Sequence, residues 1–144
     1  MSDRVSSATR VISATPEVIF ELLANPADHA RFDGSGSVQG ARADAPERLT
    51  LGATFGMDMK IGVPYRIKNT VVEFDEAKTI GWRHMGGHVW RYILEPVDGG
   101  TKVTEEFDWG LSHTPWALNL IGYPEKNRKA MEATLERLEK VATA

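Results

Sequence analysis

From residue 53 to residue 109 the chain alternates between apolar and polar positions, and short turn sequences separate the alternating runs. In the first run, Phe55, Met57 and Met59 share one face of an extended chain. A period of two predicts β-strands, which we expect at 53–61, 65–74, 79–85, 88–96 and 101–109. Gly86-Gly87 and Asp98-Gly99-Gly100 favour tight hairpin turns. The pattern therefore predicts an antiparallel meander.

The segment before the meander predicts a first strand and a pair of helices. Residues 4–13 alternate weakly, and Thr15-Pro16-Glu17 combines a hydroxyl N-cap, a proline in the first turn and an acid. An apolar stripe at helical spacing follows, made of Val18, Ile19, Leu22 and Leu23. Asn25-Pro26 ends this helix, and 27–32 predicts a second, short one. Residues 33–46 are rich in Gly, Ala and Ser, which predicts a long loop with a weak strand inside it.

The C-terminal region predicts a short helix and then a long amphipathic one. Thr114-Pro115 begins it, and Gly122 and Pro124 interrupt it, so the main helix is expected from about Pro124. One face of the main helix carries an apolar stripe that includes Met131, Leu135 and Leu138. The apolar face of the meander needs a cover, and this helix can provide it. We expect an α+β fold in which a curved antiparallel sheet of six to seven strands wraps around the long C-terminal helix.

Composition narrows the class of protein. The 144 residues are about one domain's worth of chain, so 1–144 is expected to form a single domain. The net charge is −3 and no run of Lys or Arg occurs, which argues against a nucleic-acid partner. The first ten residues lack the apolar core of a secretion signal, and no apolar stretch could span a bilayer. A cytoplasmic protein without integral membrane association is expected, either a monomer or a dimer.

Motif searches point to no cofactor. Phosphate-binding, dinucleotide-binding, zinc-protease and serine-hydrolase motifs are all missing, and zero cysteines exclude thiolate zinc sites and a cysteine nucleophile. His84 and His88 are four residues apart, but Gly86-Gly87 separates them onto two strands. A zinc site built from this pair and a carboxylate is an alternative, and our prediction is no metal.

Two stretches resemble a known family. Residues 14–32, which contain the Thr15-Pro16-Glu17 helix start and Phe32, resemble the opening of the START-like superfamily of helix-grip proteins. This group includes polyketide cyclases/dehydrases, lipid-transfer domains and plant pollen allergens. Residues 90–104 resemble its penultimate hairpin; the family often has Trp where Phe32 stands. The resemblance implies a cavity between the sheet and the C-terminal helix that holds an apolar ligand. It implies no reaction, because members range from enzymes to carriers to chaperone activators.

Strand alternation places four polar residues on apolar faces: Asn69, His84, His88 and Glu105. A carboxylate there must be paired, hydrogen-bonded or protonated, and a His–Glu pair could act as a general acid and base on a ligand. Alternatively, Glu105 pairs with Arg83 or Arg91 and the histidines reach water. The candidate ligand-binding residues are Phe55, Met57, Met59, Asn69, Trp82, His84, His88, Trp90, Tyr92, Glu105, Phe107 and Trp109, whose apolar members also suit a plain core.

Two segments are expected to border the cavity. The Asp33-Gly34-Ser35-Gly36 loop is interpreted as its mouth, and the apolar residues Trp116, Leu118 and 120–123 as a gate, with packing on the first helices as the alternative.

Three functions are consistent with the sequence. The first is binding of a small hydrophobic or amphipathic ligand, lipid or polyketide-like. The second is an enzyme of the cyclase/dehydrase type, with Glu105, His84 and His88 as candidate catalytic residues. The third is a protein-interaction role, as in chaperone-activating members of the superfamily.

Overall fold

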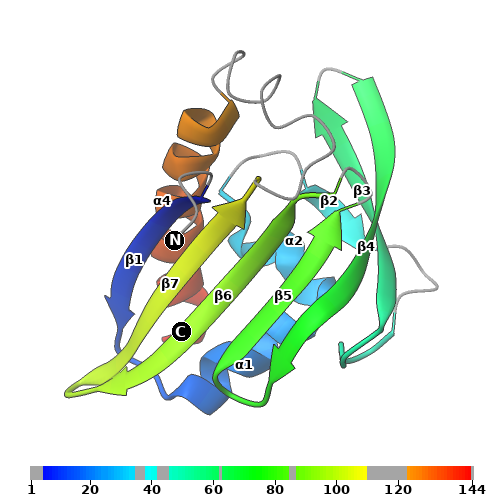
Figure 1. Ribbon diagram of the computed structural model, residues 1–144. Coiled ribbons are helices and arrows are strands. Elements are labelled where there is room, and N and C mark those ends of the chain that lie inside the picture. Colours follow the sequence, from blue (N-terminus) through cyan, green and yellow to red (C-terminus); the bar gives the residue numbers. More distant parts are fainter. Residues whose placement is uncertain are drawn as a thin grey trace.

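A computed structural model describes residues 5–34, 38–41, 46–61, 63–84, 87–109 and 123–143, with backbone only at 38–41, 58–61, 63–67 and 123–127. The described residues form one seven-stranded antiparallel sheet and a set of helices on one of its faces (Figure 1). The elements are β1 (Val5–Ile12), α1 (Pro16–Ala24), a 3-10 turn η1 (Pro26–Asp28), α2 (His29–Phe32), β2 (Val38–Ala41), β3 (Thr54–Ile61), β4 (Val63–Asp75), β5 (Thr79–His84), β6 (Val89–Val97), β7 (Gly100–Asp108) and α4 (Tyr123–Ala142).

The strand order β1-β7-β6-β5-β4-β3-β2 confirms the predicted meander. Only β1 leaves the sequential order, pairing with β7 at one end of the sheet, from Val5 opposite Asp108 to Ile12 opposite Thr101. At the β6–β7 turn, Gly99 has φ 86°, a conformation that glycine adopts without steric cost. A Cβ on Gly100 would lie 2.0 Å from the carbonyl oxygen of Ile12. This hairpin turn is therefore pressed against the end of β1.

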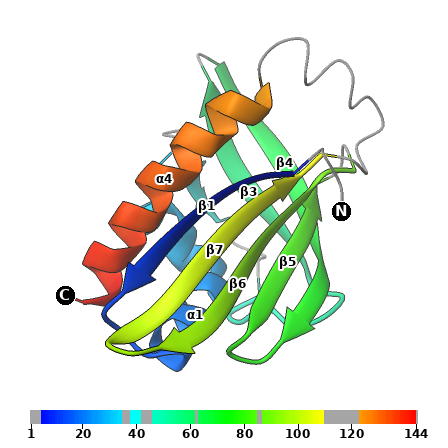
Figure 2. The ribbon, with the colours of Figure 1, turned by 60° about the vertical axis from the view of Figure 1, so that its left-hand side comes forward.

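The helix α4 lies beside β1 across one face of the sheet, and α1 and α2 lie on the same face (Figures 1 and 2). We call this helix-covered face the inner face and the opposite one the outer face. Met131, Leu135 and Leu138 are each at most 1% exposed, which confirms the predicted stripe. An ion pair of 2.8 Å between Arg10 and Glu139 joins the C-terminal part of α4 to β1. The α+β helix-grip arrangement expected from the sequence is confirmed.

The first helix begins as predicted, but the face that it buries in the core differs from the predicted apolar stripe. The Thr15 hydroxyl accepts a hydrogen bond from the Val18 amide, and Pro16 opens the helix. Val18 is 47% exposed, whereas Phe20 is 1% exposed and packs edge-on against Phe74. The stripe is thus rotated toward Ile19, Phe20, Leu23 and Ala24, because the aromatic ring removes more apolar surface from water than Val18 does.

The second predicted helix divides into η1 and α2, and the loop that follows is fixed to α4. The Gly34 amide donates to Thr134 Oγ1 at 2.8 Å, and Arg137 donates to the Asp33 carbonyl oxygen at 2.7 Å. A Cβ on Gly34 would lie 2.4 Å from the Thr134 backbone nitrogen. The predicted short helix after Thr114 and the predicted gate, apart from Tyr123 at the start of α4, fall on residues outside the described ranges.

The Gly34 contact predicts that Gly34→Ala destabilises the protein. The added methyl group would overlap the α4 backbone, and overpacking of this kind costs about 1–3 kcal/mol of unfolding free energy. Thr134→Val is the matched control, because it removes the hydrogen bond without adding bulk at Gly34 and is expected to cost about 1 kcal/mol. Urea unfolding measures both; a midpoint of Gly34→Ala equal to that of the wild type would contradict the contact.

Candidate functional site

The inner faces of β5, β6 and β7 carry two rows of large side chains. Strand register places Trp82 opposite Trp90, and Trp90 opposite Phe107. In the next row, Ile80 lies opposite Tyr92, which lies opposite Glu105. Directly opposite residues of an antiparallel pair project to the same face. The predicted alternation therefore brings these candidates together on the face that α4 covers.

The rings form two neighbouring groups. Trp82 contacts Phe55 edge-on at 5.5 Å between ring centroids and Tyr92 at 5.8 Å. Phe107 contacts Trp90 at 4.6 Å and His88 at 5.1 Å. Trp82 and Trp90 are backbone partners and connect the two groups, which we call the aromatic cluster. Phe107 is fully buried while Trp90 is only partly buried, so the cluster reaches accessible surface at Trp90.

Glu105 lies within this apolar surface. It is 4% exposed, and its Oε2 accepts a hydrogen bond of 2.9 Å from the Tyr92 hydroxyl. Its Oε1 is buried and has no hydrogen-bond partner in the part of the chain that the structure describes. Burial raises the pKa of Glu105 to about 8, with a further contribution from the negative charge of Asp33, while the Tyr92 hydrogen bond acts in the opposite sense. The carboxyl is therefore protonated at neutral pH.

Tyr92 remains a neutral hydrogen-bond donor at every physiological pH. Burial and the adjacent Glu105 raise the pKa of its phenol well above the usual value. Among the described residues, Glu105 pairs with this phenol and with no histidine or arginine, so the expected alternative of an ion pair with Arg83 or Arg91 is wrong.

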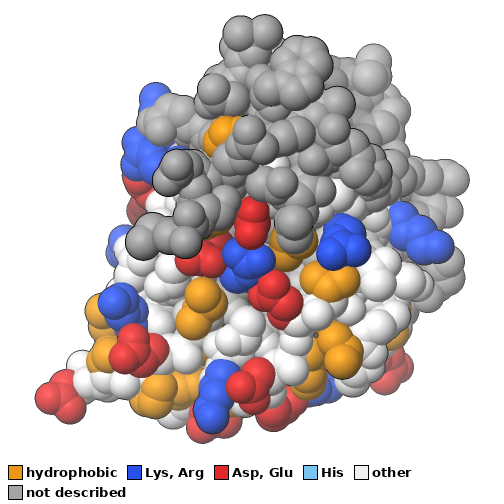
Figure 3. Space-filling view, viewed as in Figure 1, with side chains coloured by type: hydrophobic (Ala, Val, Ile, Leu, Met, Phe, Trp, Pro, Cys, Tyr) orange, Lys and Arg blue, Asp and Glu red, His pale blue; other side chains and the backbone are white. Residues whose placement is uncertain are grey.

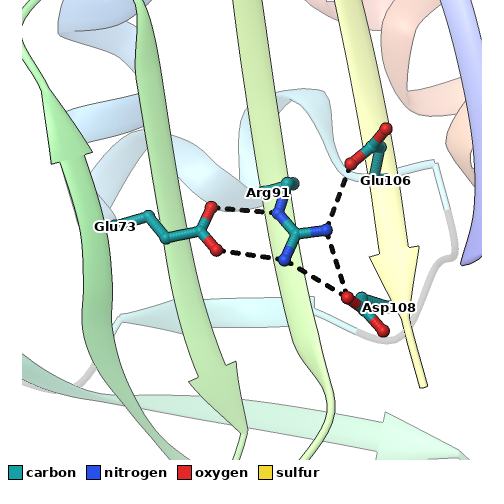
Figure 4. A network of polar contacts seen from close by, with 4 residues as sticks. All are labelled: Glu73, Arg91, Glu106 and Asp108. Carbon is teal, nitrogen blue, oxygen red and sulfur yellow. Dashed lines mark hydrogen bonds and ion pairs between the residues drawn. The ribbon is translucent and has the colours of Figure 1, made fainter. Parts of the chain in front are cut away.

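Arg91 lies on the opposite, outer face of the sheet, where it joins three carboxylates (Figure 4). It bonds to both oxygens of Glu73 at 2.9 and 3.0 Å, to Glu106 at 3.1 Å and to Asp108 at 3.4 Å. A bulge in β4 between Val71 and Glu73 shifts the register there. Adjacent residues of a strand point to opposite faces, so Arg91 is directed away from the face that holds Tyr92. On the outer face seen in Figure 3, described charges of both signs are interspersed with apolar patches.

His29 joins the aromatic cluster although the sequence analysis did not include it among the candidates. Its ring stacks on Trp82 at 5.0 Å and lies edge-on to Phe55 at 5.7 Å. Its Nε2 lies 2.8 Å from the carbonyl oxygen of Leu23, so this nitrogen carries the hydrogen. Burial lowers the pKa of His29, so the ring is uncharged at neutral pH. The hydrogen bond to Leu23 fixes its orientation beside Trp82 and Phe55. Its position three residues before Phe32 on one helix face was the available signal.

The two predicted strand histidines stack on each other, with ring centroids 4.4 Å apart. Burial, together with the charge of His84, lowers the pKa of His88 to about 4, and burial also lowers that of His84. Both rings are thus neutral at pH 7. Among the described residues, no group of three or more His, Asp or Glu side chains is placed to hold a metal ion.

The remaining candidates are distributed around the same face. Asn69 lies opposite Phe55 and His84 in the sheet and is 3% exposed. Met57 is 2% exposed and Trp109 is 8% exposed. The side chain of Met59 lies outside the described residues, and of the predicted mouth loop only Asp33 and Gly34 are described.

The protonated carboxyl predicts an unusual dependence of stability on pH. A glutamate in the unfolded chain has a pKa of about 4.3, so between about pH 4.3 and pH 8 the folded state binds one more proton than the unfolded state at this site. Stability from this group is therefore highest below pH 4.3 and is lost as pH rises toward 8, at up to about 1.4 kcal/mol per pH unit. Glu105→Gln keeps the acceptor for Tyr92 and removes this slope.

Urea unfolding of both proteins from pH 5 to pH 9 measures the effect. His88 acts in the opposite direction below about pH 6.5, because its folded-state pKa is lowered. The difference between the wild type and Glu105→Gln cancels that contribution. Parallel stability curves for the two proteins would show that Glu105 is ionised in the folded state at neutral pH.

Comparison with known proteins identifies the family. A family model described as polyketide cyclase / dehydrase and lipid transport matches residues 4–143. An uncharacterized protein of Mycobacterium tuberculosis strain H37Rv is 34% identical over 144 residues, which cover 94% of this chain and 62% of that protein. The chain thus spans less than two thirds of the length of this curated relative.

Solved structures show the same fold at low sequence identity. A crystal structure of a protein from Nitrosomonas europaea has a TM-score of 0.79 at 15% identity, covering 99% of this chain and 97% of the other. A polyketide cyclase-like protein from Corynebacterium glutamicum has a TM-score of 0.62 at 18% identity, covering 95% and 90%. In the described part of the chain, no helix combines the length and apolar character needed to cross a membrane. With the family model spanning almost its whole length, the chain belongs to the polyketide cyclase/dehydrase and lipid transport family.

Proposed function

We propose that the protein binds a small hydrophobic or amphipathic ligand, lipid or polyketide-like, between the inner face of its sheet and α4. The observation that carries the proposal is the aromatic cluster on β5–β7, which faces the helices and contains a neutral carboxyl–phenol pair. Apolar surfaces with a few polar groups are typical of small-molecule sites. Family membership supports the same function class, since its description includes lipid transport.

The cluster is suited to ligand contact because its edge is accessible. Trp90 is partly buried and packs on the fully buried Phe107. A ligand that covers Trp90 removes apolar surface from water without displacing a well-packed core side chain. Met57 on the neighbouring part of the same sheet can adapt its shape to different ligands.

An enzyme of the cyclase/dehydrase type is the second candidate. The observation that favours it is the Glu105 carboxyl, whose pKa of about 8 lies near neutral pH, as a general acid or base requires. Its hydrogen-bond partner is a phenol rather than a histidine, so any proton transfer would use Glu105 directly. Product formation from a polyketide-like substrate, lost in Glu105→Gln while substrate affinity is retained, separates an enzyme from a carrier.

The binding proposal predicts a saturable change in tryptophan fluorescence when fatty acids or planar polycyclic compounds are added at micromolar concentration. A micromolar dissociation constant corresponds to about −8 kcal/mol. Trp90→Phe is expected to remove the largest part of the change, because Trp90 is the partly exposed ring of the cluster. Leu51→Ser is the matched control for adhesion to exposed apolar surface, since Leu51 is 64% exposed in a turn, and it should leave the titration unchanged.

Native mass spectrometry of the purified protein tests the same proposal without a chosen probe, through a co-purified small molecule. Failure of a broad panel to give a saturable change, together with the absence of any such adduct, would contradict ligand binding and favour a protein-interaction role.

A further inference from the structure

The buried carboxyl of Glu105 has one oxygen engaged and one oxygen without a partner. Tyr92 donates its hydroxyl hydrogen to Oε2, so the proton of the neutral acid belongs on Oε1. That O–H group is buried and has no acceptor in the described part of the chain. An unsatisfied buried polar group costs about 1–3 kcal/mol and is uncommon in folded proteins. The buried O–H of Glu105 would be satisfied if a bound ligand supplied the missing hydrogen-bond acceptor.

The charges around Glu105 define which acceptor fits. Among the described residues, the charged group that acts on Glu105 is the carboxylate of Asp33, which is negative. His29 is held neutral by burial, and Arg91 is bound to three carboxylates on the outer face. An anionic ligand group at Glu105 would therefore lose its hydration and meet this negative charge, and no cation of the described residues acts on Glu105 to offset it. A neutral acceptor oxygen avoids both costs.

The surroundings favour a flat, apolar body attached to that oxygen. Tyr92 contacts Trp82, which also stacks on His29 with an interplanar angle of 22°. Phe107 and Trp90 continue this surface on the adjacent row. Aromatic faces of this kind pack well against planar rings.

We propose that Glu105 is a specificity-determining hydrogen-bond donor, which recognises a neutral carbonyl oxygen on an otherwise apolar, planar ligand. Oε1 donates to the carbonyl, and Tyr92 is a positioning residue that holds Oε2 and so directs Oε1 toward the ligand. This inference rests on the proposed binding function and names the ligand class that the same site selects.

A series of compounds with one ring system and different polar groups tests the inference. The probes are 2-acetylnaphthalene, 2-isopropylnaphthalene, 2-naphthoate and 2-(aminomethyl)naphthalene, and isothermal titration calorimetry at pH 6.5 measures their affinities. The ketone is expected to bind at least about tenfold more tightly than the hydrocarbon, which corresponds to about 1.4 kcal/mol. The carboxylate is expected to bind more weakly than the ketone.

Matched variants assign the preference to Glu105. In Glu105→Gln, the amide oxygen accepts from Tyr92 and the amide NH₂ takes the place of Oε1 as donor, so the ketone preference is expected to persist within about threefold. In Glu105→Met, the donor is lost without a large change in volume, and the ketone and the hydrocarbon should bind equally. In Tyr92→Phe, the preference is expected to fall while affinity for the hydrocarbon is maintained, which a purely structural role would not produce.

The outcomes separate this inference from the proposed function. Equal binding of ketone and hydrocarbon to the wild type, or an unchanged ketone preference in Glu105→Met, would overturn the inference and leave ligand binding intact. Tightest binding of the amine would also overturn it, because it would show that Glu105 receives its ligand as a carboxylate. If no member of the series and no fatty acid binds, the proposed function and the inference both fail.

Discussion

The hydrogen bond from Tyr92 to Glu105 is the interaction around which the inner face of this protein is arranged. It lies between two adjacent strands, on a surface made mostly of aromatic and aliphatic side chains. In such surroundings a carboxylate would lose its hydration without gaining a cation from the described residues, so the group retains its proton. The protein therefore keeps a neutral acid at physiological pH where a charged one would be unstable. The proposed carbonyl recognition uses this neutral donor, and the candidate catalytic role uses its raised pKa.

The two faces of β6 and β7 differ in how their carboxyl groups are stabilised: on the outer face by ion pairs, and on the inner face by loss of the charge. Arg91 and Glu106 are the chain neighbours of Tyr92 and Glu105, and they point outward. There, one guanidinium is matched by three carboxylates that remain partly hydrated. Inside, the carboxyl has a phenol as its partner, and its other oxygen is buried without a partner among the described residues. The outer network satisfies its charges within the protein, whereas the inner pair leaves one hydrogen-bonding position unfilled, which we propose a ligand occupies.

Most of the fold could be predicted from the sequence because strand alternation is a local property. The same alternation correctly placed Glu105 with Val103 and Phe107 on the buried face. The Tyr92–Glu105 pair could also have been predicted from the sequence. Val97 and Gly100 are the paired residues next to the hairpin turn, and moving five positions away from the turn along each strand leads to Tyr92 and Glu105. His29 and Phe20 were not predicted, since their placement depends on how short helices rotate against a distant sheet. Local periodicity does not contain that information.

Protonation of Glu105 at neutral pH is measured most directly by a ¹³C NMR titration of its side-chain carboxyl carbon. Assignment comes from comparison with Glu105→Gln, in which that resonance is replaced by an amide signal. We expect a midpoint at about pH 8, with the chemical shift of a protonated carboxyl at pH 6. A midpoint near the usual value for glutamate, about 4.3, would contradict it and would remove the neutral donor from the site.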